Sequence, residues 1–187
     1  MPTDPIHAEL AEIGGCVTYV RDLPFEEVVT RLGGRPKTFT PEPQRDYSTE
    51  SEAHVGIASM GDWTMIVEWS SLLGISGSVM GRLSAGTRLV SHSCLDIKAL
   101  DYFYWLDDGE LRFCFIAQEG YMEPVPAELA AFMEDIEARY PRADPHKGPM
   151  WLLTEHLTGI KPTPELLTET PRLYGMVPNV EWEIIAW

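Results

Sequence analysis

Three polar residues stand in segments that otherwise have the composition of β-strands: Glu68, Arg88 and His92. Arg88 and His92 are four residues apart, and because side chains alternate along a strand, both should project from one face. Glu68 lies on the more polar face of its own segment, and we expect that segment to form a neighbouring strand. Such a cluster could transfer protons or hold an anion. It could equally be a solvated sheet face or a structural ion pair, and both interpretations stay open.

The other polar motifs lack the spacing of known catalytic or metal sites. Ser91 and Ser93 flank His92, but alternation sends both hydroxyls to the opposite face, which makes a local Ser–His nucleophile geometrically poor. The Glu155-His156 pair has no second histidine at the spacing of a helical zinc motif. No glycine-rich segment follows a phosphate-binding pattern. We therefore expect no metal and no cofactor, and an enzymatic role is the less favoured one.

The charge of the chain limits its partners. Its 187 residues include 14 Lys and Arg against 29 Asp and Glu, a formal net charge of −15. That field repels phosphate backbones and anionic membranes, so we expect neither nucleic acid nor membrane as a direct partner. The expected partner is another protein, a basic one being favoured by the charge, or a second copy of the chain.

The cysteines and the N-terminus indicate a cytoplasmic protein. Cys16, Cys94 and Cys114 lie in apolar, strand-like contexts without metal-ligand spacing, as buried reduced thiols do. The N-terminal segment is acidic and has no apolar run, unlike a signal peptide. No segment approaches the length of a membrane span.

The hydrophobic periodicity predicts a single α+β domain over residues 1–187, mainly an antiparallel meander covered on one face by helices, with a helical C-terminal third. Most of the strands fall in the first two thirds of the chain, and the strongest local signal is the Asp-Gly turn at 107–109, which predicts a hairpin. The expected strands are 16–21, 54–60, 63–70, 87–95, 101–106 and 110–117. The strand at 101–106 is aromatic on both faces, which is typical of a strand covered twice or of an interaction surface.

Proline, capping residues and glycine predict where the helices begin and end. Helices are expected over 24–32, 127–140 and 149–158, and a further one is capped by Thr163 and runs toward Pro171. Three segments have no such periodicity. We expect a flexible lead-in at 1–13, a mobile loop at 35–53, and a terminal strand or docking tail at 180–187. The expected core includes Trp63, Val67, Leu89, Val90, Phe113 and Phe115.

Several motifs, in this order, resemble a family of uncharacterised proteins of actinobacteria. They are CVTYVRDLPFEEVVTRLGG, GDWTMIVE, LSAGTRLVSH, FYWLDDGELRFCF and LTEHLTGIKPTPELL. The resemblance covers the chain from about Cys16 to Pro178. The region after Gly120 and the tail VEWEIIAW depart from the pattern. The resemblance implies a single cytoplasmic domain, and it implies no activity, cofactor or site residue.

Three functions remain in competition. The first is a non-enzymatic binding or regulatory module that acts through protein–protein contacts, a class that includes immunity and defence proteins. It is favoured by the charge and by the surplus of aromatic residues. The second is a small-ligand binder or enzyme that uses the face with Glu68, Arg88 and His92. The third is an acidic mimic of nucleic acid, which would need its carboxylates aligned in rows.

Overall fold

The computed structural model describes residues 15–43, 48–69, 71–95, 100–116, 120–139 and 150–181. Its centre is one eight-stranded sheet in which every neighbouring pair is antiparallel. The strands are β1 (Gly15–Arg21), β2 (Glu52–Met60), β3 (Trp63–Trp69), β4 (Arg88–Leu95), β5 (Leu100–Asp107), β6 (Glu110–Ile116), β7 (Gly120–Tyr121) and β8 (Leu173–Pro178). Their order across the sheet is β7-β6-β5-β4-β1-β3-β2-β8.

The sheet consists of two locally connected parts joined by β1. Strands β4 to β7 form the predicted meander, and β2 and β3 form a hairpin around Gly61, which has a left-handed φ of 68°. Strand β1 lies between β3 and β4, so the first of the described strands occupies the middle of the sheet. The order is therefore more than a simple meander.

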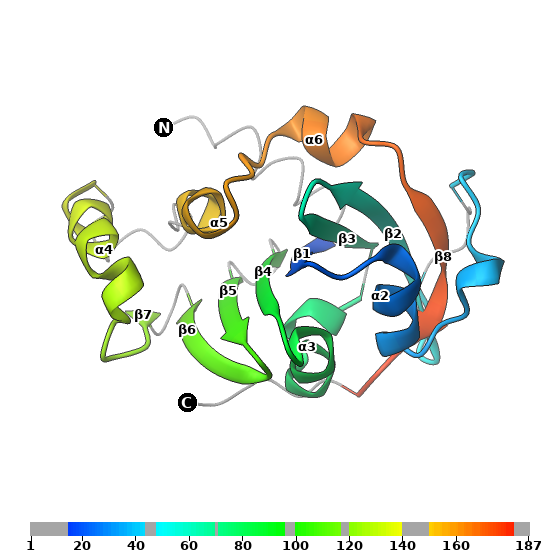
Figure 1. Cartoon of the computed structure of the whole chain (residues 1–187), viewed down its shortest axis with the longest axis horizontal. Helices are drawn as coiled ribbons and strands as arrows, with labels where there is room; N and C mark the ends of the chain where they lie inside the picture. The colour runs from blue at the N-terminus through cyan, green and yellow to red at the C-terminus, as the bar shows by residue number, and fades with distance from the viewer. Residues whose placement is uncertain are drawn as a thin grey trace.

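Helices cover both faces of the sheet, not one as predicted. On the first face lie α2 (Phe25–Arg31), α3 (Gly77–Ser84) and the 3₁₀ turn η2 (Leu73–Ile75). On the second face lie α4 (Ala127–Arg139), α5 (Met150–Thr158) and α6 (Pro164–Glu169). Figure 1 shows α5 and α6 above the sheet and α3 below it. We call these the α3 face and the α5 face.

The double cover explains the aromatic strand. In β5, Tyr102 and Tyr104 pack into the α3 face, whereas Phe103 and Trp105 pack into the α5 face. All four side chains are buried. The first of the two predicted interpretations, a strand covered twice, is therefore the one observed.

Most predicted elements are present, with ends that differ by a residue or two. Thr163 caps α6 by accepting a hydrogen bond from the backbone N–H of Leu166 at 3.1 Å, as expected from its position before Pro164. Of the expected core, all members are buried except Phe115, which is half-buried.

Strand β8, which pairs with β2 at the edge of the sheet, was not predicted from the sequence. The predicted terminal strand or tail was at 180–187 instead, of which residues 182–187 lie outside the described part and 180–181 are not in a strand. The predicted lead-in at 1–13 also lies outside it. In the loop at 35–53, a 3₁₀ turn η1 (Pro36–Thr38) and a bridge from Thr40 to Tyr174 are present. The mobility of that loop stays a prediction.

Candidate functional site

Glu68 is a buried carboxylate on the α3 face, only 1% exposed. One oxygen accepts hydrogen bonds from Ser71 Oγ and from the backbone N–H of Leu73, both at 2.8 Å. The other accepts one from the backbone N–H of Gly74 at 2.7 Å. Burial raises the pKa of Glu68 above its ordinary value, and these hydrogen bonds oppose part of that rise. The carboxylate therefore anchors the chain that leaves β3 to the sheet.

A group of small polar side chains surrounds this carboxylate. Ser91 Oγ lies 2.9 Å from Thr18 Oγ1 and 3.4 Å from Cys16 Sγ. A Cβ at Gly74 would lie 2.3 Å from Thr18 Oγ1, so only glycine lets the backbone come this close. Burial, followed by the charge of Glu68, raises the pKa of the Cys16 thiol well above its ordinary value. This Glu68 cluster (Cys16, Thr18, Glu68, Ser71 and Ser91) is a packed polar core rather than a nucleophilic site.

Arg88 is half-buried on the α5 face and is paired on two sides. Its guanidinium donates to Asp107, at 3.0 and 3.3 Å, and to Glu128 of α4, at 2.8 and 3.1 Å. It also lies over the ring of Trp105, 4.8 Å from the centroid. These contacts tie the end of the β4–β5 pair to α4.

His92 is fully buried on the same α5 face. Its ring meets Trp151 of α5 edge-on, with centroids 4.5 Å apart, and Tyr19 of β1 at 5.9 Å. Burial lowers the pKa of His92 to about 3, which keeps the imidazole neutral near neutral pH.

The predicted cluster of Glu68, Arg88 and His92 is therefore wrong, although Arg88 and His92 do share a face. Glu68 is the registered partner of Cys16, and Cys16 in turn is the partner of Ser93. Residues in register project to the same face, so Glu68 lies on the α3 face, across the sheet from His92. Alternation within each strand was correct, but it does not say which faces of two different strands coincide.

A surface groove of about 550 Å³, which was not predicted from the sequence, lies at the end of the sheet. None of its lining residues is buried. They come from the end of β1, from α2 and from the turns on either side of β4 and β5. We call this the sheet-end groove. Its lining is Arg21, Asp22, Leu23, Arg31, Ala85, Gly86, Thr87, Arg88, Asp107 and Asp108.

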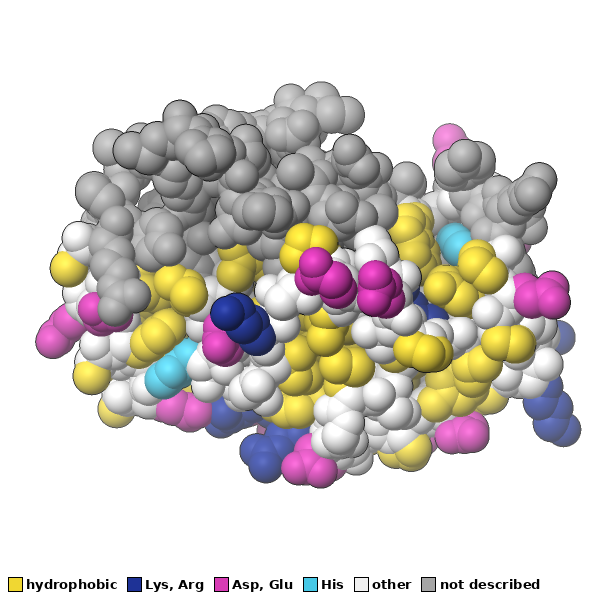
Figure 2. Space-filling view, turned by 90° about the horizontal axis from the view of Figure 1, so that it is seen from above, with side chains coloured by type: hydrophobic (Ala, Val, Ile, Leu, Met, Phe, Trp, Pro, Cys, Tyr) yellow, Lys and Arg dark blue, Asp and Glu magenta, His cyan; other side chains and the backbone are white. Residues whose placement is uncertain are grey.

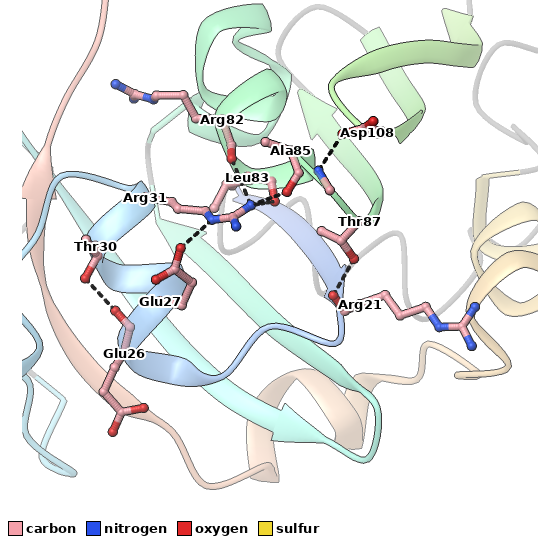
Figure 3. A network of polar contacts seen from close by, with 11 residues as sticks. Arg21, Glu26, Glu27, Thr30, Arg31, Arg82, Leu83, Ala85, Thr87 and Asp108 are labelled. Carbon is pink, nitrogen blue, oxygen red and sulfur yellow. Dashed lines mark hydrogen bonds and ion pairs between the residues drawn. The ribbon is translucent and has the colours of Figure 1, made fainter.

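Arg31 fixes one wall of the groove. Its Nε donates to Oε1 of Glu27 at 2.8 Å, which is the one ion pair of Arg31 among the described residues. The guanidinium also donates to the carbonyl oxygens of Arg82, Leu83 and Ala85 at 3.3, 3.2 and 2.6 Å (Figure 3). A cation is favourable at the carbonyl end of a helix. Arg31 therefore joins the end of α2 to the end of α3.

Left-handed turns form the rim of the groove. Asp22 and Asp108 have φ values of 51° and 50°, and Gly86 has 72°. The carboxylate of Asp108 accepts a hydrogen bond from the backbone N–H of Gly86 at 2.6 Å, and Thr87 Oγ1 donates to the carbonyl of Arg21 at 2.5 Å (Figure 3). The turn residues were visible in the sequence, but no spacing indicated that α2 would meet them.

The remaining sequence candidates have no site around them. Cys16 and Cys114 are buried and not joined in a disulfide, and the side chain of Cys94 lies outside the described part. His156 is exposed on α5 and stacks on Phe132 of α4 with centroids 4.1 Å apart. In the described ranges, no group of three or more His, Cys, Asp or Glu residues could hold a metal ion. None of the described helices is both long and apolar enough to span a membrane.

Comparison with known proteins places the chain in a family. No curated protein and no solved structure matches it significantly. The model of one family, described as a family of unknown function, DUF6461, matches residues 4–181. The match spans nearly the whole chain, and the protein therefore belongs to the DUF6461 family.

Proposed function

We propose that the protein is a non-enzymatic binding module and that its sheet-end groove receives a basic segment of a partner protein. The observation that carries this proposal is the charge around the groove. Its three arginines are matched by Asp22, Asp107 and Asp108 in the lining and by Glu27 and Glu128 just outside it. The lining alone is balanced, and when Glu27, Glu128 and Arg82 just outside it are included, five carboxylates stand against four arginines, a local surplus of one negative charge. The formal charge of −15 for the whole chain has the same sign.

The contacts that the groove arginines already make support an acidic rim. Arg31 and Arg88 are half-buried and engaged by carbonyls or carboxylates. Among the described residues, the side chain of Arg21 makes one long contact, 3.5 Å, with Asp22, whose side chain is 70% exposed. The carboxylates of Asp22 and Asp108 thus stand at an open rim beside Arg31 and Arg88, whose guanidinium groups already have partners. A lysine or arginine of the partner would find its counter-charge there.

The openness of the groove favours a polypeptide partner over a small molecule. Small-molecule sites are usually concave enough to bury most of their ligand. The groove, by contrast, has no buried lining residue, and five of its ten residues are exposed. A segment of the partner's chain lying along the groove would contact the turns at Asp22, Gly86 and Asp108.

The acidic-mimic alternative finds less support. On the face seen in Figure 2, the described acidic side chains are spread apart among hydrophobic and basic ones rather than aligned in a row. A mimic of nucleic acid needs regularly spaced charge over a long surface. The proposal therefore stays with a protein partner.

The test begins with affinity purification of the full-length protein from its host and proceeds to calorimetric titration with the purified partner. The doubly substituted variant Asp22→Asn, Asp108→Asn should bind at least about tenfold more weakly and should lose most of the salt dependence of binding. Asparagine tolerates the left-handed backbone at both positions, so the fold should be kept. The control is Glu134→Gln with Glu169→Gln, two exposed carboxylates on α4 and α6. Unchanged affinity in the first variant, or an equal loss in the control, contradicts the proposal.

A further inference from the structure

A second cavity, of about 250 Å³, lies at the edge of the sheet beside the place where β8 begins. The strand pairing explains its position. The register of β2 with β8 ends at Ile57 and Leu173, whereas β2 continues to Met60. In the described part of the chain, no strand therefore pairs with the outer side of β2 beyond Ile57, and the cavity lies there. We call it the edge cavity.

The walls of the edge cavity are mainly apolar. Its apolar lining residues are Phe25, Pro41, Ile57, Ala58, Pro171 and Leu173, and its polar ones are Ser59 and Arg172. Leu173 is 36% exposed, and it is the one exposed large hydrophobic side chain among the described residues. The cavity is large enough for several waters, but apolar walls offer water few hydrogen-bond partners. An apolar group would fit these walls better.

Arg172 is the one charged residue of the lining, and only 6% of it is exposed. Its Nη2 donates to the carbonyl of Leu166 at 3.0 Å and to that of Leu167, both in α6. Its Nε has no hydrogen-bond partner in the described part of the chain, and none of the salt bridges between described residues includes it. A buried guanidinium without a carboxylate is unfavourable, and two carbonyl dipoles compensate its charge only in part. The cavity wall therefore lacks one negative charge.

The side chain of Arg172 is held in place from two directions. It crosses over Gly56 of β2, where a Cβ would lie 3.0 Å from its Cδ. Gly56 directly precedes Ile57 and Ala58, which line the cavity. The carbonyls of α6 hold the other end of the side chain. A guanidinium fixed in this way loses little further freedom when it binds an anion.

The lining defines the chemistry of what would fit. A single positive charge next to apolar walls favours a monoanion with an apolar body. A phosphate dianion would bring an uncompensated negative charge, and acetate or chloride would leave the apolar walls uncovered. Because the formal net charge of −15 opposes every anion, burial of apolar surface must contribute much of the affinity.

We propose that the edge cavity binds a small organic monocarboxylate whose body is aromatic or branched aliphatic. The carboxylate accepts hydrogen bonds from the guanidinium of Arg172, and the apolar body packs against Phe25, Ile57 and Leu173. The edge cavity shares no lining residue with the sheet-end groove, so this inference does not rest on the proposed partner.

The first experiment compares defined probes on the full-length protein. Phenylacetate and isovalerate are titrated by calorimetry, each beside its neutral amide, with acetate and inorganic phosphate as anions that lack an apolar body. At least one of the two acids should bind with one-to-one stoichiometry and raise Tm. It should bind at least about tenfold more tightly than its amide, which lacks the charge, and than acetate or phosphate, which lack the body.

A matched pair of variants tests the place of binding. Leu173→Asp and Leu173→Asn have nearly the same shape and differ by one negative charge at the exposed wall of the cavity. The acid should bind at least about fivefold more weakly to Leu173→Asp than to Leu173→Asn, because like charges repel. The neutral amide should not distinguish the two variants.

A third variant tests the guanidinium. Arg172→Gln should bind the acid at least about tenfold more weakly than the wild type does. The control is Arg112→Gln, which removes an exposed arginine of β6 and should leave the affinity unchanged. Arg172 also binds the carbonyls of α6, so thermal unfolding checks that Arg172→Gln is folded, and the Leu173 pair decides if it is not.

Each of four outcomes would overturn the inference. The first is that neither acid binds at millimolar concentration. The second is that the amides, acetate or phosphate bind as tightly as the acids. The third is equal affinity of Leu173→Asp and Leu173→Asn for the acid, and the fourth is a folded Arg172→Gln that binds the acid as the wild type does.

Discussion

The two faces of the sheet treat buried polar groups in opposite ways. On the α3 face, the polar side chains of the Glu68 cluster hydrogen-bond to one another and to the backbone of the η2 turn. On the α5 face, Tyr19, His92 and Arg172 keep buried atoms without a partner in the part of the chain that the structure describes. Strands β1 and β4 contribute to both sets.

The difference comes from what covers each face. The η2 turn presents backbone N–H groups to Glu68, whereas α5 presents buried Met150 and Leu153 and satisfies its own Thr154 through the carbonyl of Met150. Depth of burial is similar on the two faces, so burial alone does not determine whether a polar side chain is hydrogen-bonded. The backbone groups that the covering segment presents do determine it.

The largest expected effect tests the structural role of the α3 face. Glu68→Ala would leave the N–H groups of Leu73 and Gly74 and the hydroxyl of Ser71 without an acceptor. We expect the free energy of unfolding to fall by about 3–5 kcal/mol, as measured by denaturation in urea. Ser71→Ala, which removes one donor and leaves the carboxylate two backbone partners, should cost about 1 kcal/mol. A loss below about 1 kcal/mol for Glu68→Ala would show that the cluster does not hold the fold together.

The second test concerns the close approach of the η2 turn to the cluster. In Gly74→Ala, the new Cβ would lie 2.3 Å from Thr18 Oγ1, 2.5 Å from Cys16 Sγ and 2.7 Å from Ser91 Oγ. Overpacking of this kind costs about 1–3 kcal/mol, read from the midpoint of thermal or urea unfolding. The matched control is Gly81→Ala in α3, where a Cβ meets nothing within 4 Å and the higher helix propensity should stabilise the protein by up to about 1 kcal/mol. Equal effects of the two substitutions would mean that the turn can move away from the sheet.

The smallest change in stability is expected for a substitution on the α5 face. His92→Leu replaces a buried imidazole that has no hydrogen-bond partner, so near neutral pH the stability should change by less than about 1 kcal/mol or should rise. The acid response should change more. In the wild type the unfolded chain takes up a proton at this histidine below about pH 6.5, whereas the folded chain does so only near pH 3.

The direction of the pH effect on stability follows from that difference in proton uptake. Between these values the unfolded state binds more protons, so His92 has no pH-linked effect on stability above about pH 6.5 and destabilises the folded state increasingly as the pH falls toward 3. The slope is at most about 1.4 kcal/mol per pH unit. His92→Leu should flatten this part of the curve in urea unfolding measured at several pH values. An identical acid response of wild type and His92→Leu would show that the imidazole takes up its proton in the folded state.

The local elements could be predicted from the sequence because local patterns specify them. The Asp-Gly turn at 107–109 fixes the β5–β6 hairpin, and Thr163 with Pro164 fixes the start of α6. Strand β8 could not be predicted in the same way. Its residues 173–178 include Gly175 and Pro178 and show no alternation, and they form a strand because β2 offers them an edge.

The site could not be predicted because it depends on pairings between distant strands. Glu68 and His92 each stood correctly on a face of their own strand, and only the register through β1 shows that those faces are opposite. Arg172 follows a proline at the end of a helix, where nothing in the sequence indicates that its side chain turns inward over Gly56. The sheet-end groove likewise depends on α2 meeting α3 through Arg31.

The central position of β1 has a consequence for the order in which the protein folds. The β2–β3 hairpin and the β4–β7 meander join neighbours in sequence, and such units form early because they close short loops. Strand β1 is made first by the ribosome but must wait for both, since Thr18 and Ser91 are 73 residues apart. Until β1 inserts, the inner edges of β3 and β4 are open to pairing with other chains. We therefore expect the insertion of β1 between β3 and β4 to be a late step of sheet assembly, and the nascent chain to be exposed to aggregation until it occurs.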